Sequence, residues 1–181
     1  MLFDRLKIVQ GLRDLFLAND SKAFHLACEA LEVNTKNIDE FEGEFNRFFV
    51  GPKAPLAAPY ASLYLESRGT IMSKTTESVR ELYSFMGFVN PKEGSIPEDF
   101  LGLELDAYYQ LLHVELVKKI DYLKSLRIFF LKNHILTWIP DFIESVKSSS
   151  KKPSNELLAL MDLIDAFFNS ELSIQGENDE K

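Results

Sequence analysis

The stretch SIPEDFLGLELDAYYQLLHVEL, residues 95–116, decides the fold that we predict for this chain. Ser95 and Glu98 have the Ser-x-x-Glu spacing of a capping box, and Pro97 falls in the first turn, where a missing backbone donor costs nothing. Apolar side chains then recur every three or four residues, at Phe100, Leu101, Leu103, Leu105, Tyr108, Leu111, Leu112 and Leu116. This apolar stripe is too wide for a surface helix. We therefore expect a long helix that begins near residue 96 and lies at the centre of a bundle.

The same periodicity runs through most of the chain, and no alternating strand pattern competes with it. Capping residues precede three further expected helices, at Asp20–Ser21, Thr35 and Ser73–Thr75. After the central helix we expect helical stretches over 122–147, with a bend at Pro140, and over 155–171. The sequence therefore predicts an all-α, single-domain helical bundle over residues 1–172, followed by a polar, acidic tail over 173–181 that frays.

Composition and charge exclude several classes of protein. The 181 residues are 46% hydrophobic, which is enough apolar surface to form one core. A net charge of −8 argues against nucleic acid as a partner, because phosphate binding needs clustered lysine and arginine. It suits a basic partner, although acidity also serves solubility. Charges interrupt the N-terminus at once and no run approaches a membrane span, so we expect a cytoplasmic protein without a signal peptide or an integral membrane segment.

Motifs for common catalytic and metal chemistry are missing. No glycine is followed by lysine, which excludes a phosphate-binding loop. Lys22, Gln110 and Leu131 lie three residues before the three histidines, where a carboxylate-bridged diiron bundle needs glutamate. The single cysteine, Cys28, and the dispersed histidines give zinc no framework. We therefore predict no enzyme activity, no cofactor and no metal, and interpret Cys28 as a small buried apolar residue.

The segment VGPKAPLAAPY, residues 50–60, departs from the helical pattern. Its three prolines forbid a regular helix and bias the residues before them toward extended geometry. Aromatic residues flank the segment, with Phe45, Phe48 and Phe49 before it and Tyr60 and Tyr64 at its end and after it. We expect a stiff connection between helices that makes the two aromatic groups face each other or the core.

Three motifs together carry a resemblance to a known family. Phe45-x-x-Phe48-Phe49-Val50-Gly51-Pro52, followed by Pro59-Tyr60-x-Ser62-x-Tyr64, resembles the first motif of the TorD/DmsD/NarJ family of redox-enzyme maturation chaperones. Residues 97–105, PEDFLGLEL, resemble the family's second motif, and residues 130–138, FLKNHILTW, resemble its third. The motifs occur in the family's order and span about residues 41–146.

The resemblance implies an all-helical chaperone of the TorD-like type. Such a protein binds the twin-arginine signal peptide of a molybdenum-cofactor oxidoreductase in the cytoplasm, assists cofactor insertion and prevents premature export. Some members also bind the enzyme body. Both a monomer and a domain-swapped homodimer are compatible with the sequence. The alternative from a different class is a helical adaptor or regulator that uses the same groove for an amphipathic segment of another protein.

The resemblance also implies a peptide-binding site. Carried over by position, the site comprises Phe45, Phe48, Phe49, Pro59, Tyr60, Tyr64, Asp99 and Phe100. Phe100 stands where the family usually has histidine, which favours apolar contact at that position. The motifs contain five further residues that we expect to be structural: Gly51, Pro52, Glu104, His134 and Trp138. His134 and Trp138 are four residues apart and share one face of a helix.

Two interpretations remain open for several of these residues. A twin-arginine signal peptide has a basic part followed by an apolar part, so its receptor needs an apolar groove with carboxylates at one end. Asp99, Glu98 or Glu104 could supply those carboxylates. Glu98 and Asp99 would also fall in the first turn of a helix, where the helix dipole favours acidic side chains whatever the function. Phe45, Phe48 and Phe49 cannot all face one way, so at least one of the three belongs to the core.

Overall fold

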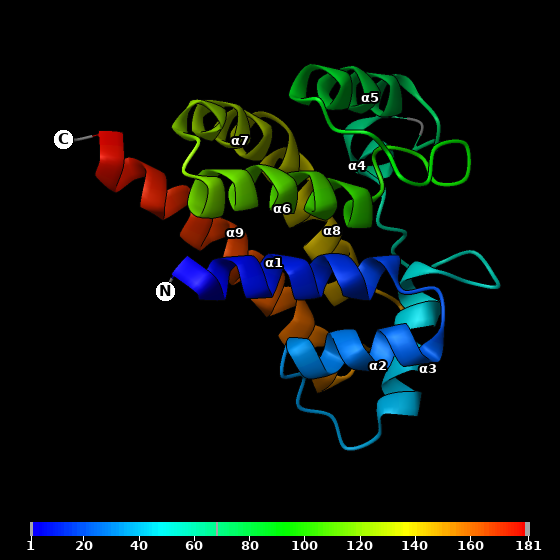
Figure 1. The fold of residues 1–181 in the computed structure, drawn as a ribbon. Coiled ribbons are helices and arrows are strands. Elements are labelled where there is room, and N and C mark those ends of the chain that lie inside the picture. The colour runs from blue at the N-terminus through cyan, green and yellow to red at the C-terminus, as the bar shows by residue number, and fades with distance from the viewer. Residues whose placement is uncertain (1, 68, 180–181) are drawn as a thin grey trace.

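The computed structural model describes residues 2–67 and 69–179, and Figure 1 shows a bundle of helices. The helices are α1 (Leu2–Leu17), α2 (Ser21–Ala30), α3 (Ile38–Phe49), α4 (Ala61–Leu65), α5 (Lys74–Met86), α6 (Leu101–Lys118), α7 (Lys124–Phe130), α8 (Leu136–Lys147) and α9 (Asn155–Asp179). Within the described residues there is no strand, only an isolated antiparallel bridge between Tyr60 and Phe100. The prediction of an all-α bundle is confirmed. None of the described helices is both long and apolar enough to span a membrane.

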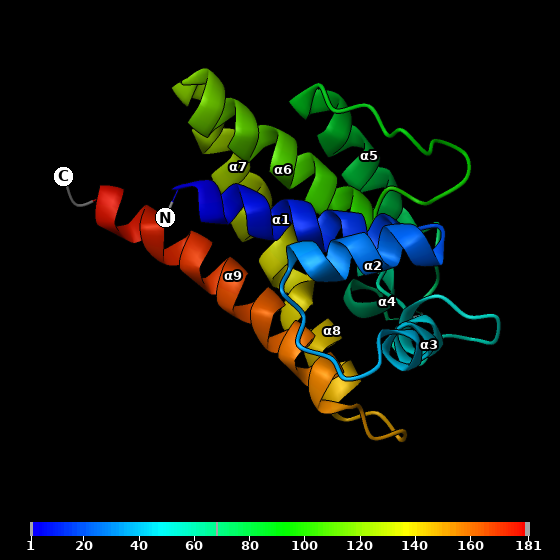
Figure 2. The same cartoon turned by 60° about the horizontal axis from the view of Figure 1, so that its bottom comes forward.

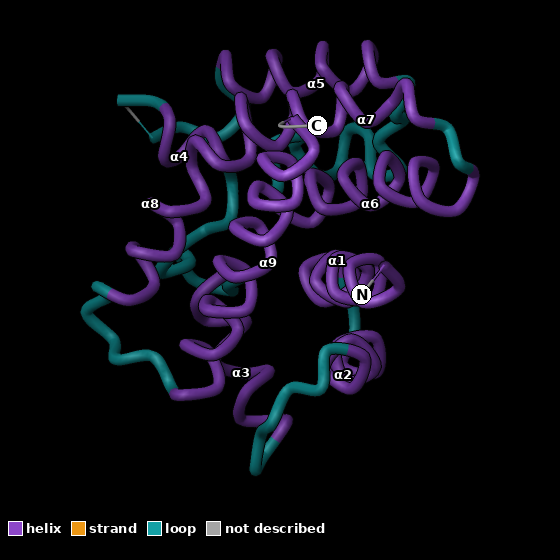
Figure 3. Tube along the Cα trace, turned by 90° about the vertical axis from the view of Figure 1, so that its left-hand side faces the viewer, coloured by secondary structure: helices purple, strands orange, loops and turns teal. Residues whose placement is uncertain are grey.

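The centre of the bundle is the pair α1 and α6, which lie side by side in Figures 1 and 2. Figure 3 looks along α1 and places α6 on one side of it and α2 on the other. Gly102 allows α1 and α6 to approach closely, because a Cβ at that position would lie 3.0 Å from the side chain of Leu17 and 2.7 Å from the ring of Phe100. The long helix α9 runs past α1, α3 and α8 and closes the core.

A network of buried charges joins four of these helices. Arg127 of α7 is fully buried and donates through Nε to Glu115 Oε2 at 2.7 Å and through Nη1 to Glu171 Oε2 at 3.1 Å. Tyr108 of α6 accepts from Arg127 at 2.6 Å and donates to Glu171, which also accepts two bonds from Arg5. Two arginines and two glutamates therefore neutralise each other where α1, α6, α7 and α9 meet, as buried charges require.

The central helix begins later than the sequence predicts. Ser95 is exposed and Glu98 makes no capping box with it; α6 begins at Leu101, with Phe100 as its N-cap residue. Arg80 instead donates two bonds to the Glu98 carboxylate, at 2.9 and 3.1 Å, and Tyr83 donates to the Glu98 carbonyl at 2.9 Å. Phe100 N–H also donates to the Pro97 carbonyl at 3.1 Å, so residues 97–100 form a turn, and Phe100 itself is extended directly before α6.

The region expected as one helix over 122–147 contains two other elements. It starts in a short 3₁₀ turn, η1 (Asp121–Leu123), and a π-helical turn, η2 (Leu131–Ile135), separates α7 from α8. The departure from α-helical geometry therefore precedes Pro140, which lies inside α8. Pro140 has no N–H, so it cannot donate to the carbonyl of Leu136, four residues earlier. The helical hydrogen-bond pattern is therefore interrupted at the first residue of α8.

Other local predictions have mixed outcomes. Asp20 caps α2 and Ser73 is the N-cap residue of α5, as predicted, whereas Asn37 rather than Thr35 caps α3. Cys28 is buried, as predicted. In the structure the segment from Ser173 continues α9 through Asp179, and the last two residues of the predicted tail, 180–181, lie outside the described residues.

Candidate functional site

The three phenylalanines of the first motif lie in the core. Phe45, Phe48 and Phe49 are each at most 3% exposed. The rings of Phe45 and Phe49 pack against Phe16 of α1, and Phe49 also packs against Phe142 of α8, with centroid distances of 5.3 to 5.6 Å. The expectation that at least one of them is a core residue is confirmed. Their rings are therefore enclosed among other aromatic rings of the core, and the prediction that they contact a peptide has no support in this conformation.

Gly51 and Pro52 shape the connection that follows α3. Gly51 has φ of 122°, a backbone conformation that side chains with Cβ rarely adopt, and its N–H donates to the Asn46 carbonyl at 2.8 Å. Pro52 is exposed. The connection then returns to the end of α3, where Ala57 N–H donates to the Phe48 carbonyl at 2.9 Å. The proline-rich segment is thus tied to the helix that precedes it.

The first and second motifs meet at the antiparallel backbone bridge between Tyr60 and Phe100. Leu101 N–H donates to the Pro59 carbonyl at 2.9 Å and Ala61 N–H donates to the Asp99 carbonyl at 3.0 Å. The side chains of the two bridged residues are also in contact. The ring centroids of Tyr60 and Phe100 lie 5.2 Å apart, and both side chains are half-buried. The structure therefore brings together Pro59, Tyr60, Asp99 and Phe100, which are about forty residues apart in the sequence.

The Asp99 side chain points inward. Its Oδ2 accepts from Ser62 N–H at 2.9 Å, in the first turn of α4, and its Oδ1 accepts from the Thr76 hydroxyl at 2.8 Å, in the first turn of α5. The side chain is fully buried. Asp99 therefore joins the starts of α4, α5 and α6. In this conformation its carboxylate is enclosed and is not accessible to a peptide.

Glu104, His134 and Trp138 bring the second and third motifs together. The buried Glu104 carboxylate lies 2.7 Å from His134 Nε2 and accepts from Trp138 Nε1 at 3.1 Å. Burial raises the pKa of Glu104. Burial by itself would lower the pKa of His134, but the attraction and hydrogen bond of Glu104 outweigh it, so that the pKa of His134 is raised. Tyr64 stacks on Trp138 at 5.6 Å and donates to the Ala58 carbonyl.

An open groove of about 600 Å³ lies beside this trio. Its walls come from the end of α4, from α5, and from α7 and the π-helical turn; they comprise Leu65, Glu66, Ser67, Lys74, Thr75, Ser78, Val79, Leu82, Phe129, Asn133 and His134. Leu65 and Phe129 are 41% and 51% exposed, so the groove offers accessible apolar surface. Asn133 and His134, both in the third motif, line this groove, whereas none of the eight residues predicted to bind peptide lines it.

One carboxylate, Glu66, is held at the edge of the groove. Its Oε1 accepts from the hydroxyl of Ser73, from Thr75 N–H at 2.8 Å and from Thr75 Oγ1 at 2.8 Å. The Ser73 and Thr75 hydrogen bonds lower the pKa of Glu66 and favour its ionised form. The described contacts use Oε1, which leaves Oε2 as an acceptor. The sequence analysis missed Glu66, and the only cue in the sequence was its position directly after the first motif.

Comparisons with known proteins show which family the chain resembles. A model of the family described as nitrate reductase delta subunit matches residues 14–144. The chain is 28% identical over 131 residues to the chaperone protein TorD of Photobacterium profundum, and 29% identical over 109 residues to that of Vibrio cholerae. These matches cover 70% and 58% of this chain and 61% and 49% of the two relatives. The chain thus spans half to three-fifths of the length of the curated relatives that it matches.

Proposed function

Because this chain belongs to the nitrate reductase delta subunit family, we propose that it is a cytoplasmic, non-enzymatic chaperone of a molybdenum-cofactor oxidoreductase. In this proposal it binds the twin-arginine signal peptide of that enzyme, assists insertion of the cofactor and prevents premature export. Relatives named chaperone protein TorD support the chaperone class. The observation that carries peptide binding is the groove between α4, α5 and α7, which has apolar walls and an ionised carboxylate at its edge.

The apolar walls suit the apolar part of a signal peptide. Leu65, Val79, Leu82 and Phe129 come from three helices and converge on one cavity. A volume of about 600 Å³ lies within the range of ligand pockets and accepts a few side chains of a peptide rather than a folded domain. Burial of Leu65 and Phe129 against such a segment would remove apolar surface from water, which is the main favourable contribution to binding.

Glu66 suits the basic part of the peptide. A guanidinium group can donate to the free Oε2 while Oε1 stays bonded to Ser73 and Thr75, so the carboxylate need not reorganise on binding. Lys74 also lines the groove, so an arginine has to compete with a lysine for this charge. We assign direct contact with the arginines to Glu66, and to Asp99 the positioning of the two helices that carry the groove.

Tyr60 and Phe100 extend the proposed surface. Tyr60 is the N-cap of α4 and Leu65 is its last residue, so their backbone positions differ by roughly 8 Å of helix rise. Both rings are half-buried and leave apolar surface accessible. An extended peptide that occupies the groove has the length to reach them. Phe45, Phe48, Phe49 and Pro59 contribute beneath this surface, and Tyr64 contributes by stacking on Trp138.

The test is binding of synthetic twin-arginine leader peptides from molybdenum enzymes encoded beside this chain, measured by isothermal titration calorimetry. We expect Glu66→Gln to weaken the Arg-Arg peptide more than a Gln-Gln version, with a difference that shrinks as salt is added. Tyr60→Ala should lose about 1–3 kcal/mol with both peptides, mainly through faster dissociation. Glu77→Gln is the matched control, because Glu77 is an exposed glutamate of α5 outside the groove.

The outcomes separate the two classes of function. If the Glu66 and Glu77 variants lose equal affinity for the Arg-Arg peptide, Glu66 is not part of the site and the loss is a non-specific effect of charge. If no leader peptide binds at all, the chain is an adaptor for another amphipathic segment, and the family then describes its fold without this function.

A further inference from the structure

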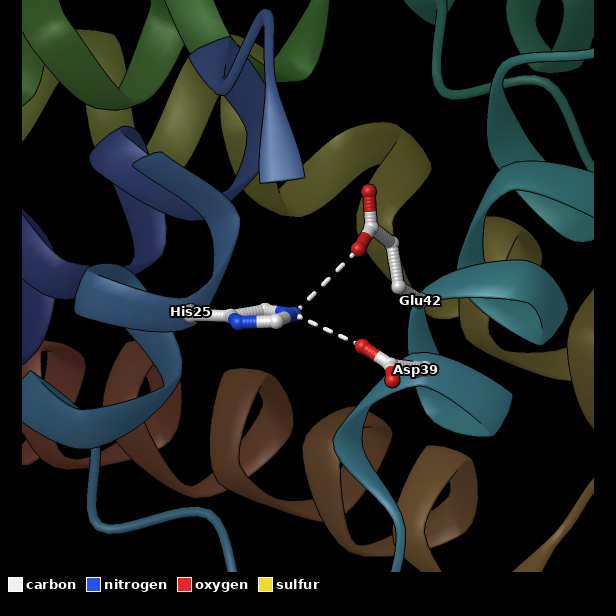
Figure 4. Close-up of side chains that lie close together, drawn as sticks. All are labelled: His25, Asp39 and Glu42. Carbon is white, nitrogen blue, oxygen red and sulfur yellow. Dashed lines mark ion pairs between the residues drawn. The ribbon is translucent and has the colours of Figure 1, made fainter. Parts of the chain in front are cut away.

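A second group of polar side chains lies away from the groove, between α2 and α3 (Figure 4). His25 comes from the middle of α2, and Asp39 and Glu42 come from the first two turns of α3. Asp39 and Glu42 are three residues apart, so both face the same side of the helix. In Figure 4 the two carboxylates converge on the imidazole, and one donor atom of each residue lies within 4.8 Å of the other two.

The contacts within this group are not ordinary hydrogen bonds. His25 Nε2 lies 3.4 Å from Asp39 Oδ1 and 3.3 Å from Glu42 Oε2, beyond the usual length of about 2.9 Å for an N–H···O bond. In the described part of the chain, His25 Nε2 is one of two buried side-chain atoms without a hydrogen-bond partner. His134 Nε2 offers the contrast, at 2.7 Å from Glu104. His25 Nε2 therefore faces two carboxylates at ion-pair distance and donates a hydrogen bond to neither, on a side chain that is 33% exposed.

The spacing matches the coordination shell of a small cation. Ligand atoms at about 2.0 Å from a tetrahedral zinc ion lie about 3.3 Å from each other, which is the separation of His25 Nε2 from both carboxylates. A second contact orients one ligand, because the Ser21 hydroxyl donates to Glu42 Oε1 at 2.8 Å and leaves Oε2 directed at the imidazole. Hydrogen bonds of this kind to the outer oxygen of a ligand are typical of metal sites.

We propose that His25, Asp39 and Glu42 form a binding site for a divalent transition-metal cation, with Zn²⁺ as the best fit. The imidazole nitrogen selects Zn²⁺ over Ca²⁺ and Mg²⁺, which prefer oxygen ligands alone. The two carboxylates neutralise the charge of the ion. Asp39 is exposed, so the fourth position opens to solvent and can hold water. The ion would clamp α2 to α3, the helix that carries the phenylalanines of the first motif. This proposal does not depend on the peptide-binding function.

The test is titration of the untagged, chelator-treated full chain with Zn²⁺, followed by calorimetry and by thermal unfolding. We expect one equivalent to bind with micromolar affinity and to raise Tm, because the ion binds the folded chain. His25→Gln and Glu42→Gln should each weaken the affinity at least about tenfold and abolish the rise in Tm. Two variants are matched controls and should bind as the unmodified chain does: Cys28→Ala, which removes the only thiol, and His113→Gln, which removes a histidine of α6.

Three results would overturn the proposal. The first is the absence of one-equivalent binding in the unmodified chain. The second is binding that survives in both His25→Gln and Glu42→Gln, which would show adventitious zinc on other side chains. The third is loss of binding in Cys28→Ala, which would assign the ion to the thiol. Circular dichroism of the metal-free variants checks folding, and Glu42→Asp keeps the charge if Glu42→Gln does not fold.

Discussion

Buried charges occur toward both ends of α6, and the two groups differ in what surrounds them. At the start of the helix, Asp99 and Glu104 are held by a backbone N–H, a hydroxyl, an indole and a histidine. Toward its end, Glu115 and Glu171 are held by arginines. His134 of the first group also lines the groove, whereas Arg127 of the second is sealed in the core. The first group therefore includes a side chain of the groove wall, and the second does not.

Arg127→Met tests the sealed group and should have the largest effect. The substitution leaves Glu115 and Glu171 without their buried partner, so we expect a loss of about 3–5 kcal/mol of unfolding free energy, measured by urea denaturation. The peptide affinity of the folded fraction should not change. A variant that also replaces Arg5 with methionine and both glutamates with leucine should recover much of the stability, because no partly buried charge is then left unpaired. Weakened peptide binding by folded Arg127→Met would contradict the separation of the two groups.

Asp99→Asn tests the group beside the groove. Both carboxylate oxygens of Asp99 accept a hydrogen bond, whereas an amide has one acceptor oxygen and places an NH₂ group opposite the donor of Ser62 or Thr76. We therefore expect the free energy of unfolding, measured by urea denaturation, to fall by about 1–3 kcal/mol. Peptide affinity should fall by the same factor for Arg-Arg and Gln-Gln peptides, because the walls of the groove move while Glu66 keeps its charge. Thr76→Val, which removes one donor and keeps the carboxylate, is the control. A loss confined to the Arg-Arg peptide would instead make Asp99 a direct contact.

The pair of Glu104 and His134 should give the smallest effect, a pH dependence of Tm. The pKa of His134 is raised in the folded state, so its stabilising contribution is complete below its unfolded value of about 6.5 and is lost as pH rises through the folded pKa. The raised pKa of Glu104 acts in the same direction, because its ionisation in the core disfavours folding. We therefore expect Tm to decline as pH rises from about 6.5, and His134→Gln to flatten that decline. An unchanged slope in the variant would assign the decline to other groups.

The helices and the family were accessible to sequence reasoning. Apolar periodicity is a local property, so it located the elements and the caps at Asp20 and Ser73, and the family inferred from the three motifs is confirmed by the match over residues 14–144. The start of α6 was predicted about five residues too early. Ser95 and Glu98 have the spacing of a local capping box, but Arg80, eighteen residues earlier in the chain, binds the Glu98 carboxylate. A long-range ion pair replaced the local hydrogen bond.

The candidate site was less accessible. The motifs pointed to Glu104, His134 and Trp138 as structural residues, and the structure places the three in one buried contact. Asp99 was expected at the basic end of a groove, and its carboxylate instead bonds to the starts of two other helices. Glu66 escaped notice because its role depends on Ser73 and Thr75, which belong to another helix start. The group of His25, Asp39 and Glu42 was not predicted from the sequence for the same reason, because its residues come from two helices.

The sequence by itself determined that this chain folds as helices, where most of them lie and to which family it belongs. Those properties depend on residues that are close in the chain, whose spacing sets helical faces, caps and motifs. Only the tertiary structure decided which polar side chains are enclosed and which face a cavity. Asp99 lies just before α6 and Glu66 just after α4, and the first carboxylate is buried while the second borders the groove. Burial is the sum of contacts from distant segments, and no local pattern of residues contains that sum.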